Sequence, residues 1–254
     1  VELAERVHRP ALWKEAPNVV SRGEGRLYLP EPGDTIDLDF LPLPAYDEAT
    51  YPAVHEGGKL GLYTIDHSRG CAHPAHCRAQ APWNNRMVRV KAPTRMCEEL
   101  RALCDVAEAQ AFHYAGPDTP GPQVHALAHE LLARGLGACY SRDAHVKEWT
   151  AADGEASGPS RIRKLHASGC RAVEFQIDTG SQRLLEDYYG HDFGVSQTVG
   201  VLAACRNAGL STVVGLTYPC PHDDYHTREE TLRVLRLAQP GSVRVAMPET
   251  PPYS

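Results

Sequence analysis

The pattern of hydrophobic and polar positions changes at about residue 59 of this chain. Beyond it, short apolar runs with a period of two alternate with longer stretches of helical period. The apolar runs predict strands at residues 60–66, 111–115, 137–141, 171–177, 211–217 and 242–247. The helical stretches lie between them, at residues 94–108, 123–134, 160–168, 194–208 and 227–238. Because crossovers between parallel strands are right-handed, this alternation predicts βαβ units with a parallel sheet and outer helices.

Two architectures fit this alternation. Six strands without a dinucleotide glycine fingerprint suit either a doubly wound sheet or a partial barrel, and the periodicity favours neither. Both are α/β folds in which chemistry gathers at the carboxyl ends of the strands. Residues 1–58 differ, because seven prolines interrupt them and they contain one short alternation. We therefore predict a surface or linking segment at residues 1–58 and an α/β core at residues 59–254.

Composition narrows the class of protein. A chain of 254 residues can bury a full α/β core, and its net charge of −6 argues against a nucleic-acid groove as its main site. It has no apolar run of 18 residues and no segment that resembles a signal peptide. Its eight cysteines are too sparse for a secreted disulfide framework. These features predict a cytoplasmic protein that acts on neither membrane nor nucleic acid.

Further expectations concern the interior. Thr227 and Glu230 have the spacing of a capping box at the start of the last helix. In the fourth strand, Val173, Phe175 and Ile177 share one face, which is expected to be buried. Most cysteines fall within helices or strands and are expected in the core, namely Cys97, Cys104, Cys139, Cys170 and Cys205.

The most informative segment follows the first predicted strand. The sequence Ser68-Arg69-Gly70 leads into a proline-broken loop that contains Cys71, His73, His76 and Cys77. Thiolates and imidazoles are ligands of zinc and of iron–sulfur clusters. A loop of this composition at a strand end therefore predicts a metal or cluster site at the mouth of the fold.

A second group of metal-type ligands follows the fifth strand. His222, Asp224 and His226 lie within six residues, and together with another residue at the mouth they suit a zinc hydrolase. Runs of this kind are more often solvated loops, which is the alternative interpretation.

Several short motifs occur in a distinctive order between residues 25 and 254. The first are Gly25-Arg26-Leu27, residues 41–47, Ser68-Arg69-Gly70-Cys71 and residues 89–100. The later ones are Ser141-Arg142-Asp143 and residues 169–175, 177–181, 208–210, 215–219 and 227–232. In this order they resemble the radical S-adenosylmethionine (SAM) superfamily, in the branch that carries a cobalamin-binding domain before the barrel.

The resemblance implies a partial (β/α)6 barrel of parallel strands with outer helices. It makes residues 1–58 a linker, or the edge of a preceding cobalamin-binding domain. In this superfamily a Cys-x3-Cys-x2-Cys loop holds a [4Fe–4S] cluster that cleaves SAM to a 5′-deoxyadenosyl radical, and in this branch a methyl group often passes through cobalt. The loop of this chain differs from that pattern. Its cysteines, Cys71 and Cys77, have the spacing Cys-x5-Cys, and Ala75 and Arg78 occupy the other two expected positions.

The departure leaves the third cluster ligand open. Cys71 and Cys77 are the two thiolates, and His73, His76 or Cys220 is the candidate for the remaining ligand. A barrel that binds no cluster is the alternative.

The resemblance also implies a binding site for SAM. It assigns Asp178, Thr179, Gly180 and Ser181 to the ribose or methionyl end of SAM, and Arg142 to its carboxylate. An ordinary turn with Ser181 as N-cap and a surface ion pair of Arg142 are the structural alternatives.

Three functions follow from these patterns. The first is cobalamin-dependent methyl transfer, or related radical chemistry, on a small natural-product-like substrate, with a cobalamin-binding domain or an electron donor as partner. The second is a degenerate barrel that binds SAM or cobalamin without a cluster, as a non-redox enzyme or a scaffold. The third is the zinc hydrolase.

Overall fold

The computed structural model describes residues 6–16, 21–23, 26–28, 36–44, 46, 61–70, 88–107, 109–116, 119–150 and 158–248. The chain divides into two compact units, residues 1–41 and residues 42–254. The boundary predicted from the sequence, at residue 58, lies outside the described residues and stays a prediction.

The described residues of the first unit form short elements. A 3-10 helix, η1 (Pro10–Glu15), precedes an antiparallel pair of strands, β1 (Ser21–Gly23) and β2 (Arg26–Tyr28), and a second 3-10 turn, η2 (Leu38–Phe40), follows. The proline at the first helical position of η1 suits the helix start, where its missing N–H leaves no hydrogen bond unmade.

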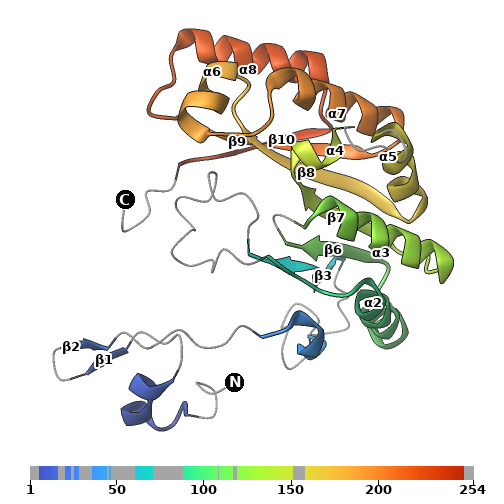
Figure 1. The fold of residues 1–254 in the computed structure, drawn as a ribbon, viewed down its shortest axis with the longest axis vertical. Coiled ribbons are helices and arrows are strands. Elements are labelled where there is room, and N and C mark those ends of the chain that lie inside the picture. Colours follow the sequence, from blue (N-terminus) through green and yellow to red (C-terminus); the bar gives the residue numbers. More distant parts are fainter. Residues whose placement is uncertain are drawn as a thin grey trace. The chain divides into compact units, whose positions relative to one another are not determined.

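The second unit contains a six-stranded parallel sheet in the order β10-β9-β8-β7-β6-β3. Its strands are β3 (Tyr63–Asp66), β6 (Ala111–Ala115), β7 (Cys139–Ala144), β8 (Cys170–Asp178), β9 (Ser211–Thr217) and β10 (Ser242–Ala246). From β3 to β10 the strands neighbour one another in chain order (Figure 1). The predicted α/β class and parallel sheet are therefore confirmed.

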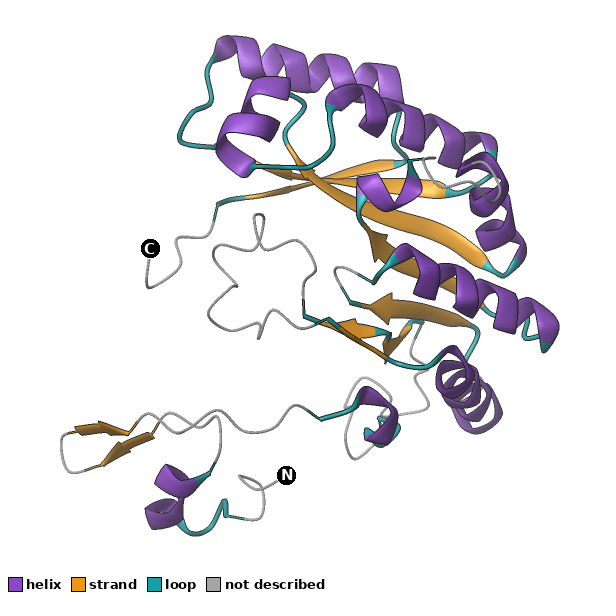
Figure 2. Cartoon of the chain, viewed as in Figure 1, coloured by secondary structure: helices purple, strands orange, loops and turns teal. Residues whose placement is uncertain are grey.

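Among the described residues, five long helices alternate with these strands. They are α2 (Pro93–Ala107), α3 (Gly121–Ala133), α5 (Gly158–Ala167), α7 (Val195–Asn207) and α8 (Tyr225–Ala238). Figure 2 shows them on one face of the sheet. Among the described residues of the second unit, three shorter helices were not predicted, because they contain too few residues for a helical period: α4 (Val146–Trp149), α6 (Gln182–Leu184) and the π-helix η4 (Leu185–Tyr189).

The core lies between the sheet and this helical layer. Val173, Phe175 and Ile177 of β8 are buried, as their shared face predicts. Met96 and Leu100 of α2 are buried one turn apart, since residues four apart lie on the same side of a helix. The period of each element therefore sets which side chains enter the core.

The first strand of the sheet has an edge that a side chain protects. The Tyr46 hydroxyl donates to the Thr64 carbonyl at 2.6 Å and accepts from the Thr64 N–H at 3.1 Å. Beyond β3, a small antiparallel ribbon pairs β4 (Ser68–Arg69) with β5 (Arg89–Val90). This ribbon brackets the segment in which the metal loop was predicted.

Two expectations about the interior are wrong. Cys139 is exposed, because it begins β7 at the amino-terminal rim of the sheet. The cap of α8 is formed by Asp224, whose carboxylate accepts from the Thr227 N–H at 2.9 Å, and the helix begins at Tyr225. The predicted capping box of Thr227 and Glu230 therefore starts one turn too late. Cys97, Cys170 and Cys205 are buried as expected, and Cys104 is half-buried.

Among the described residues, no helix has the length and apolar character that crossing a membrane requires.

A buried ion pair joins the ribbon to α2. Lys91 Nζ donates to both oxygens of Glu99, at 2.9 and 2.8 Å, and the two side chains are only 3% and 2% exposed. Arg95 Nε lies 3.3 Å from Glu99 Oε1. Removing one partner of such a pair leaves a buried charge uncompensated.

We expect Glu99→Gln to lower the free energy of unfolding by about 3–5 kcal/mol, because the Lys91 ammonium loses its counter-charge. Urea unfolding at neutral pH measures the loss. Glu98→Gln, on the same helix at a largely exposed position, is the control and is expected to change little. Equal losses in the two variants would contradict the argument.

Candidate functional site at the carboxyl ends of the strands

The face of the sheet opposite the described helices, here called the inner face, is polar. Parallel register places His113 beside Ser141 and Asp143 beside Glu174. Phe175, which alternates with Glu174 along β8, is buried against the helices. Polar side chains thus occupy the positions that the helical layer does not cover.

Ion pairs and hydrogen bonds connect the inner face across its strands. Arg244 Nε of β10 donates to Glu174 Oε1 at 2.7 Å, and its guanidinium also donates to Gln176 Oε1 at 3.1 Å. Between β6 and β7, His113 Nδ1 lies 3.0 Å from Ser141 Oγ. Burial and the neighbouring Glu174 carboxylate raise the pKa of Asp143. This face can therefore bind polar groups, with carboxylates near its centre.

Asp178 is the meeting point of hydrogen bonds at the carboxyl ends of β8 and β9. Its Oδ1 accepts from Thr217 Oγ1 at 2.6 Å and from Gln176 Nε2 at 2.8 Å, and its Oδ2 lies 2.9 Å from His191 Nε2. Burial alone would raise the pKa of Asp178, but the hydrogen bonds from His191, Thr217 and Gln176 outweigh it and hold the pKa below its ordinary value. The carboxylate is therefore anionic at neutral pH.

The backbone at Asp178 is strained. Its φ is +62°, in the left-handed region, and the register with β9 shifts between Gln176 and Asp178. A non-glycine residue in this region costs of order 1–3 kcal/mol and persists only where the surroundings impose it. Here the hydrogen bonds to the carboxylate offset that cost, and such strain is frequent at functional sites.

The segment after β8 returns a histidine to Asp178. The helix α6 continues into the π-helix η4, which ends at Gly190 in the left-handed conformation. The His191 N–H then donates to the Leu185 carbonyl at 2.8 Å. π-Helical turns are often found at functional sites, and this one directs the chain back towards the strand end.

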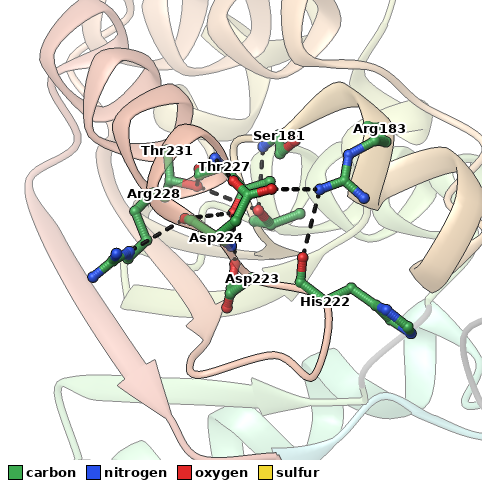
Figure 3. Close-up of polar contacts among 9 residues, drawn as sticks. Ser181, Arg183, His222, Asp223, Asp224, Thr227, Arg228 and Thr231 are labelled. Carbon is green, nitrogen blue, oxygen red and sulfur yellow. Dashed lines mark hydrogen bonds and ion pairs between the residues drawn. The ribbon is translucent and has the colours of Figure 1, made fainter.

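The turn between β8 and α6 packs directly against α8 (Figure 3). The Gly180 N–H donates to Thr231 Oγ1 at 2.9 Å, and a Cβ on Gly180 would lie 2.6 Å from the Thr231 Cα. Glycine is therefore required for this close approach. Ser181 occupies the N-cap of α6 but makes no capping bond, and its buried hydroxyl has no hydrogen-bond partner among the described residues.

A cavity of about 280 Å³ lies between α8 and the edge of the sheet. Leu216, Leu235, Val243 and Val245 give it an apolar lining, and Asp178 and Thr217 stand at its polar end.

Most of the predicted metal ligands cannot be placed. Cys71, His73, His76 and Cys77 all lie outside the described residues. Cys220 follows β9, as predicted, and is 5% exposed. Its thiol forms a hydrogen bond with Tyr189. The pKa of Tyr189 is raised, mainly by burial and secondly by this hydrogen bond. The assignment of these residues as cluster ligands therefore stays a prediction.

Arg142 is buried rather than displayed on the surface. Its side chain is 2% exposed, it lies beside the buried Val173 in the register, and its Nε donates to the Asp143 carbonyl at 3.1 Å. Burial lowers the pKa of this guanidinium. The alternative of a surface ion pair is therefore wrong, whereas its role with the SAM carboxylate stays a prediction.

The structure does not bring together the residues predicted for a zinc site after β9. Among residues 219–226, all of which are described, and the rest of the described chain, no three His, Cys, Asp or Glu side chains form a metal-binding group. Asp224 caps α8 and pairs with Arg183 at 3.3 Å. His222 packs against Tyr188, with ring centroids 4.9 Å apart. Capping and packing therefore use these side chains instead.

Sequence reasoning missed the partners of Asp178. Alternation along β8 placed Gln176 on the face opposite the core, and that signal was available. Thr217 ends β9 and could have been grouped with Asp178 because both end parallel strands. His191 gave no such signal, since the π-helix that returns it to Asp178 has no periodic pattern.

No family model and no curated protein matches the sequence. The fold, however, matches solved structures. The cobalamin-dependent S-adenosylmethionine radical enzyme OxsB, in a structure with aqua-cobalamin, aligns with a TM-score of 0.72 and 14% identity over 92% of this chain and 34% of its own. The fold is that of the radical SAM barrels.

Two further structures agree. The radical S-adenosylmethionine methyltransferase TsrM from Kitasatospora setae, with tryptophan and a SAM analogue bound, aligns with a TM-score of 0.60 and 17% identity over 73% of this chain and 36% of its own. Coproporphyrinogen III oxidase (HemN) from Escherichia coli aligns with a TM-score of 0.52 and 15% identity, over 79% and 47%. The chain thus spans about a third of the OxsB and TsrM chains and under half of HemN.

We expect Thr217→Val to lower the free energy of unfolding by about 2 kcal/mol at pH 7, because Asp178 loses a charge-assisted hydrogen bond. Since the folded pKa of Asp178 is depressed, this stabilisation is present above the pKa of the unfolded carboxyl and is lost as the pH falls through the folded pKa. Urea unfolding from pH 7 down to about pH 2 should show the two proteins converging at the acidic end, because the contribution of Asp178 is lost only below its depressed pKa.

The matched control for this prediction is Thr64→Val, an exposed threonine of β3 with no side-chain hydrogen bond to a described residue. A difference between Thr217→Val and the parent that grows towards acidic pH would contradict the role given to Asp178.

Proposed function

We propose that this chain is the barrel part of a radical SAM enzyme that binds SAM at the carboxyl ends of β8 and β9. The observation that carries the proposal is the fold likeness to OxsB over 92% of the chain. In OxsB this fold occurs together with bound aqua-cobalamin and SAM. The reaction that we propose is methyl transfer or related radical chemistry on a small molecule, in the cobalamin-dependent branch.

The described residues fit SAM as a ligand. SAM presents ribose hydroxyls, an adenine and a zwitterionic methionyl end, which need both donors and acceptors. The Ser181 hydroxyl has no partner among the described residues, and the anionic Asp178 lies at the same strand end. Asp178, Thr179, Gly180 and Ser181 are therefore the residues that would hold SAM. When bound, SAM supplies a methyl group or a radical for the reaction.

The protein's own contribution is orientation. The hydrogen bonds from Gln176, Thr217 and His191 fix the Asp178 carboxylate before any ligand arrives. A preorganised acceptor loses less conformational entropy when a ribose hydroxyl binds to it. The contacts of Gly180 with α8 hold the neighbouring turn in the same way.

The inner face is the proposed substrate site. Its hydrogen-bonding side chains include His113, Asp143 and Glu174, which favour a small polar molecule. The net charge of −6 agrees with a substrate other than nucleic acid.

The cluster rests on Cys71 and Cys77 with one ligand from His73, His76 or Cys220. We propose cobalamin on the sequence resemblance and on the fold likeness to OxsB and TsrM. Residues 1–58 are proposed to adjoin the domain that would hold it.

A degenerate barrel is the second candidate, and the Cys-x5-Cys spacing favours it. Two thiolates leave a [4Fe–4S] cluster without the usual third cysteine. Such a protein would bind SAM or cobalamin without iron.

We expect protein purified and reconstituted without oxygen to be brown and to contain about four irons per chain, as a [4Fe–4S] cluster requires. Elemental analysis for iron, cobalt and zinc, absorption spectroscopy and calorimetric titration with SAM are the measurements. Cys71→Ala and Cys77→Ala should each abolish iron binding. Cys139→Ala, at an exposed cysteine on the amino-terminal rim of the sheet and away from the carboxyl ends of the strands, is the matched control and should retain it.

The outcomes separate the two candidates. Iron-free protein that still binds SAM would support the degenerate barrel and exclude the catalytic version. Protein that binds neither iron, SAM nor cobalamin would exclude both.

A further inference from the structure

We propose that His191 is a positioning residue that sets the geometry of the Asp178 carboxylate, and through it the affinity of the site for SAM. This inference rests on the proposed function for its ligand. It concerns a residue that no sequence motif indicated, placed by the π-helix η4 rather than by the sheet.

The Asp178 carboxylate takes donors from three separate segments. Gln176 belongs to the same strand, Thr217 ends the neighbouring strand, and His191 comes from the connection after η4. The first two donors both bind Oδ1, so His191 is the described partner that fixes Oδ2. Without it, the carboxylate could rotate about the bond to its Cβ atom, held by Oδ1 alone.

The packing of the imidazole selects one orientation. The His191 side chain is 4% exposed, and its ring lies 4.5 Å from the Phe193 ring and 5.9 Å from the Tyr189 ring, measured between centroids. The Tyr189 hydroxyl itself reaches the Thr217 carbonyl at 3.5 Å. The aromatic contacts therefore hold Nε2 towards Asp178, and the same segment contacts the end of β9.

The position of the Asp178 carboxylate affects the turn that follows it, which is the proposed SAM site. Thr179 and Ser181 are linked by a hydrogen bond of 3.2 Å, and the Thr179 N–H donates to the Ile177 carbonyl at 2.7 Å, so the turn follows directly from the backbone at Asp178. A shift of Asp178 would therefore change the whole turn that is proposed to hold SAM. His191 acts on the ligand through Asp178, without touching it.

Two substitutions separate the hydrogen bond from the packing. His191→Phe keeps an aromatic ring next to Phe193 but removes the donor. His191→Gln loses the ring but keeps an amide N–H at the reach of Nε2. The matched control is His129→Phe, at an exposed position of α3.

Calorimetric titration of the anaerobically prepared proteins with SAM measures the effect. We expect His191→Phe to raise the dissociation constant roughly tenfold or more, as for the loss of a hydrogen bond to a charged group. His191→Gln should recover most of the affinity, and His129→Phe should leave it within about twofold of the parent. Loss of affinity in His191→Gln equal to that in His191→Phe would overturn the proposal.

A double-mutant cycle with Asp178→Asn tests whether His191 acts through Asp178. If it does, His191→Phe changes SAM binding in the parent but adds little once Asp178 is replaced. Additive effects of the two substitutions would overturn the proposal. Thermal unfolding of each variant verifies that the compared proteins are folded.

Failure of the proposed function can be distinguished from failure of the positioning role of His191. If the parent chain does not bind SAM, the positioning role is still tested by amide hydrogen exchange at Thr179 and Tyr218, whose N–H groups donate to Ile177 and Ala246. Faster exchange at these two amides in His191→Phe, with recovery in His191→Gln, supports the role. Unchanged exchange in His191→Phe would overturn it.

Discussion

The structure depends on one constraint, which is that the described helices cover only one face of the parallel sheet. The strands bury Phe112, Phe175 and their neighbours against that helical layer. Successive side chains of a strand point to opposite faces, so the intervening positions must tolerate an environment without a helix. They carry His113, Ser141, Asp143, Glu174 and Gln176, and the burial of one face thereby leaves a polar surface on the other.

That polar surface continues to the strand ends through a chain of interactions. Arg244 joins Glu174 to Gln176, Gln176 donates to Asp178, and Asp178 accepts from Thr217. Groups in the middle of the sheet are in this way connected to the turn after β8. Because each link is a directional hydrogen bond or ion pair, the arrangement orients the Asp178 carboxylate before a ligand binds. Preorganisation of this kind is what a site for a small polar cofactor requires.

The comparison with OxsB, TsrM and HemN agrees with this geometry at the level of the fold. At identities of 14–17%, the structural likeness supports the fold alone and leaves the reaction as a proposal. The chemistry of the chain's own residues then becomes the main source of inference. The loop predicted to hold a cluster departs from the spacing of the superfamily that it resembles, whereas the carboxyl end of β8 has a strained aspartate with hydrogen-bond partners on both carboxylate oxygens. The described structure therefore supports the proposed SAM site, whereas the proposed cluster rests on the sequence alone.

The sequence by itself determined the order of strands and helices, because periodicity reports which side chains are buried. It predicted β6 and β9 at their observed bounds and placed Asp178 at a strand end. It predicted the cap of α8 wrongly and suggested a zinc site. An aspartate before a helix can be either an N-cap or a metal ligand, and only the folded neighbours of Asp224 show that it is the cap. Only the tertiary structure brought His191 to Asp178 and buried Arg142, since contacts between residues 13 apart or on adjacent strands depend on the path of the chain and on register. Local sequence patterns indicate which side chains are buried, whereas contacts between distant side chains are set by the folded backbone.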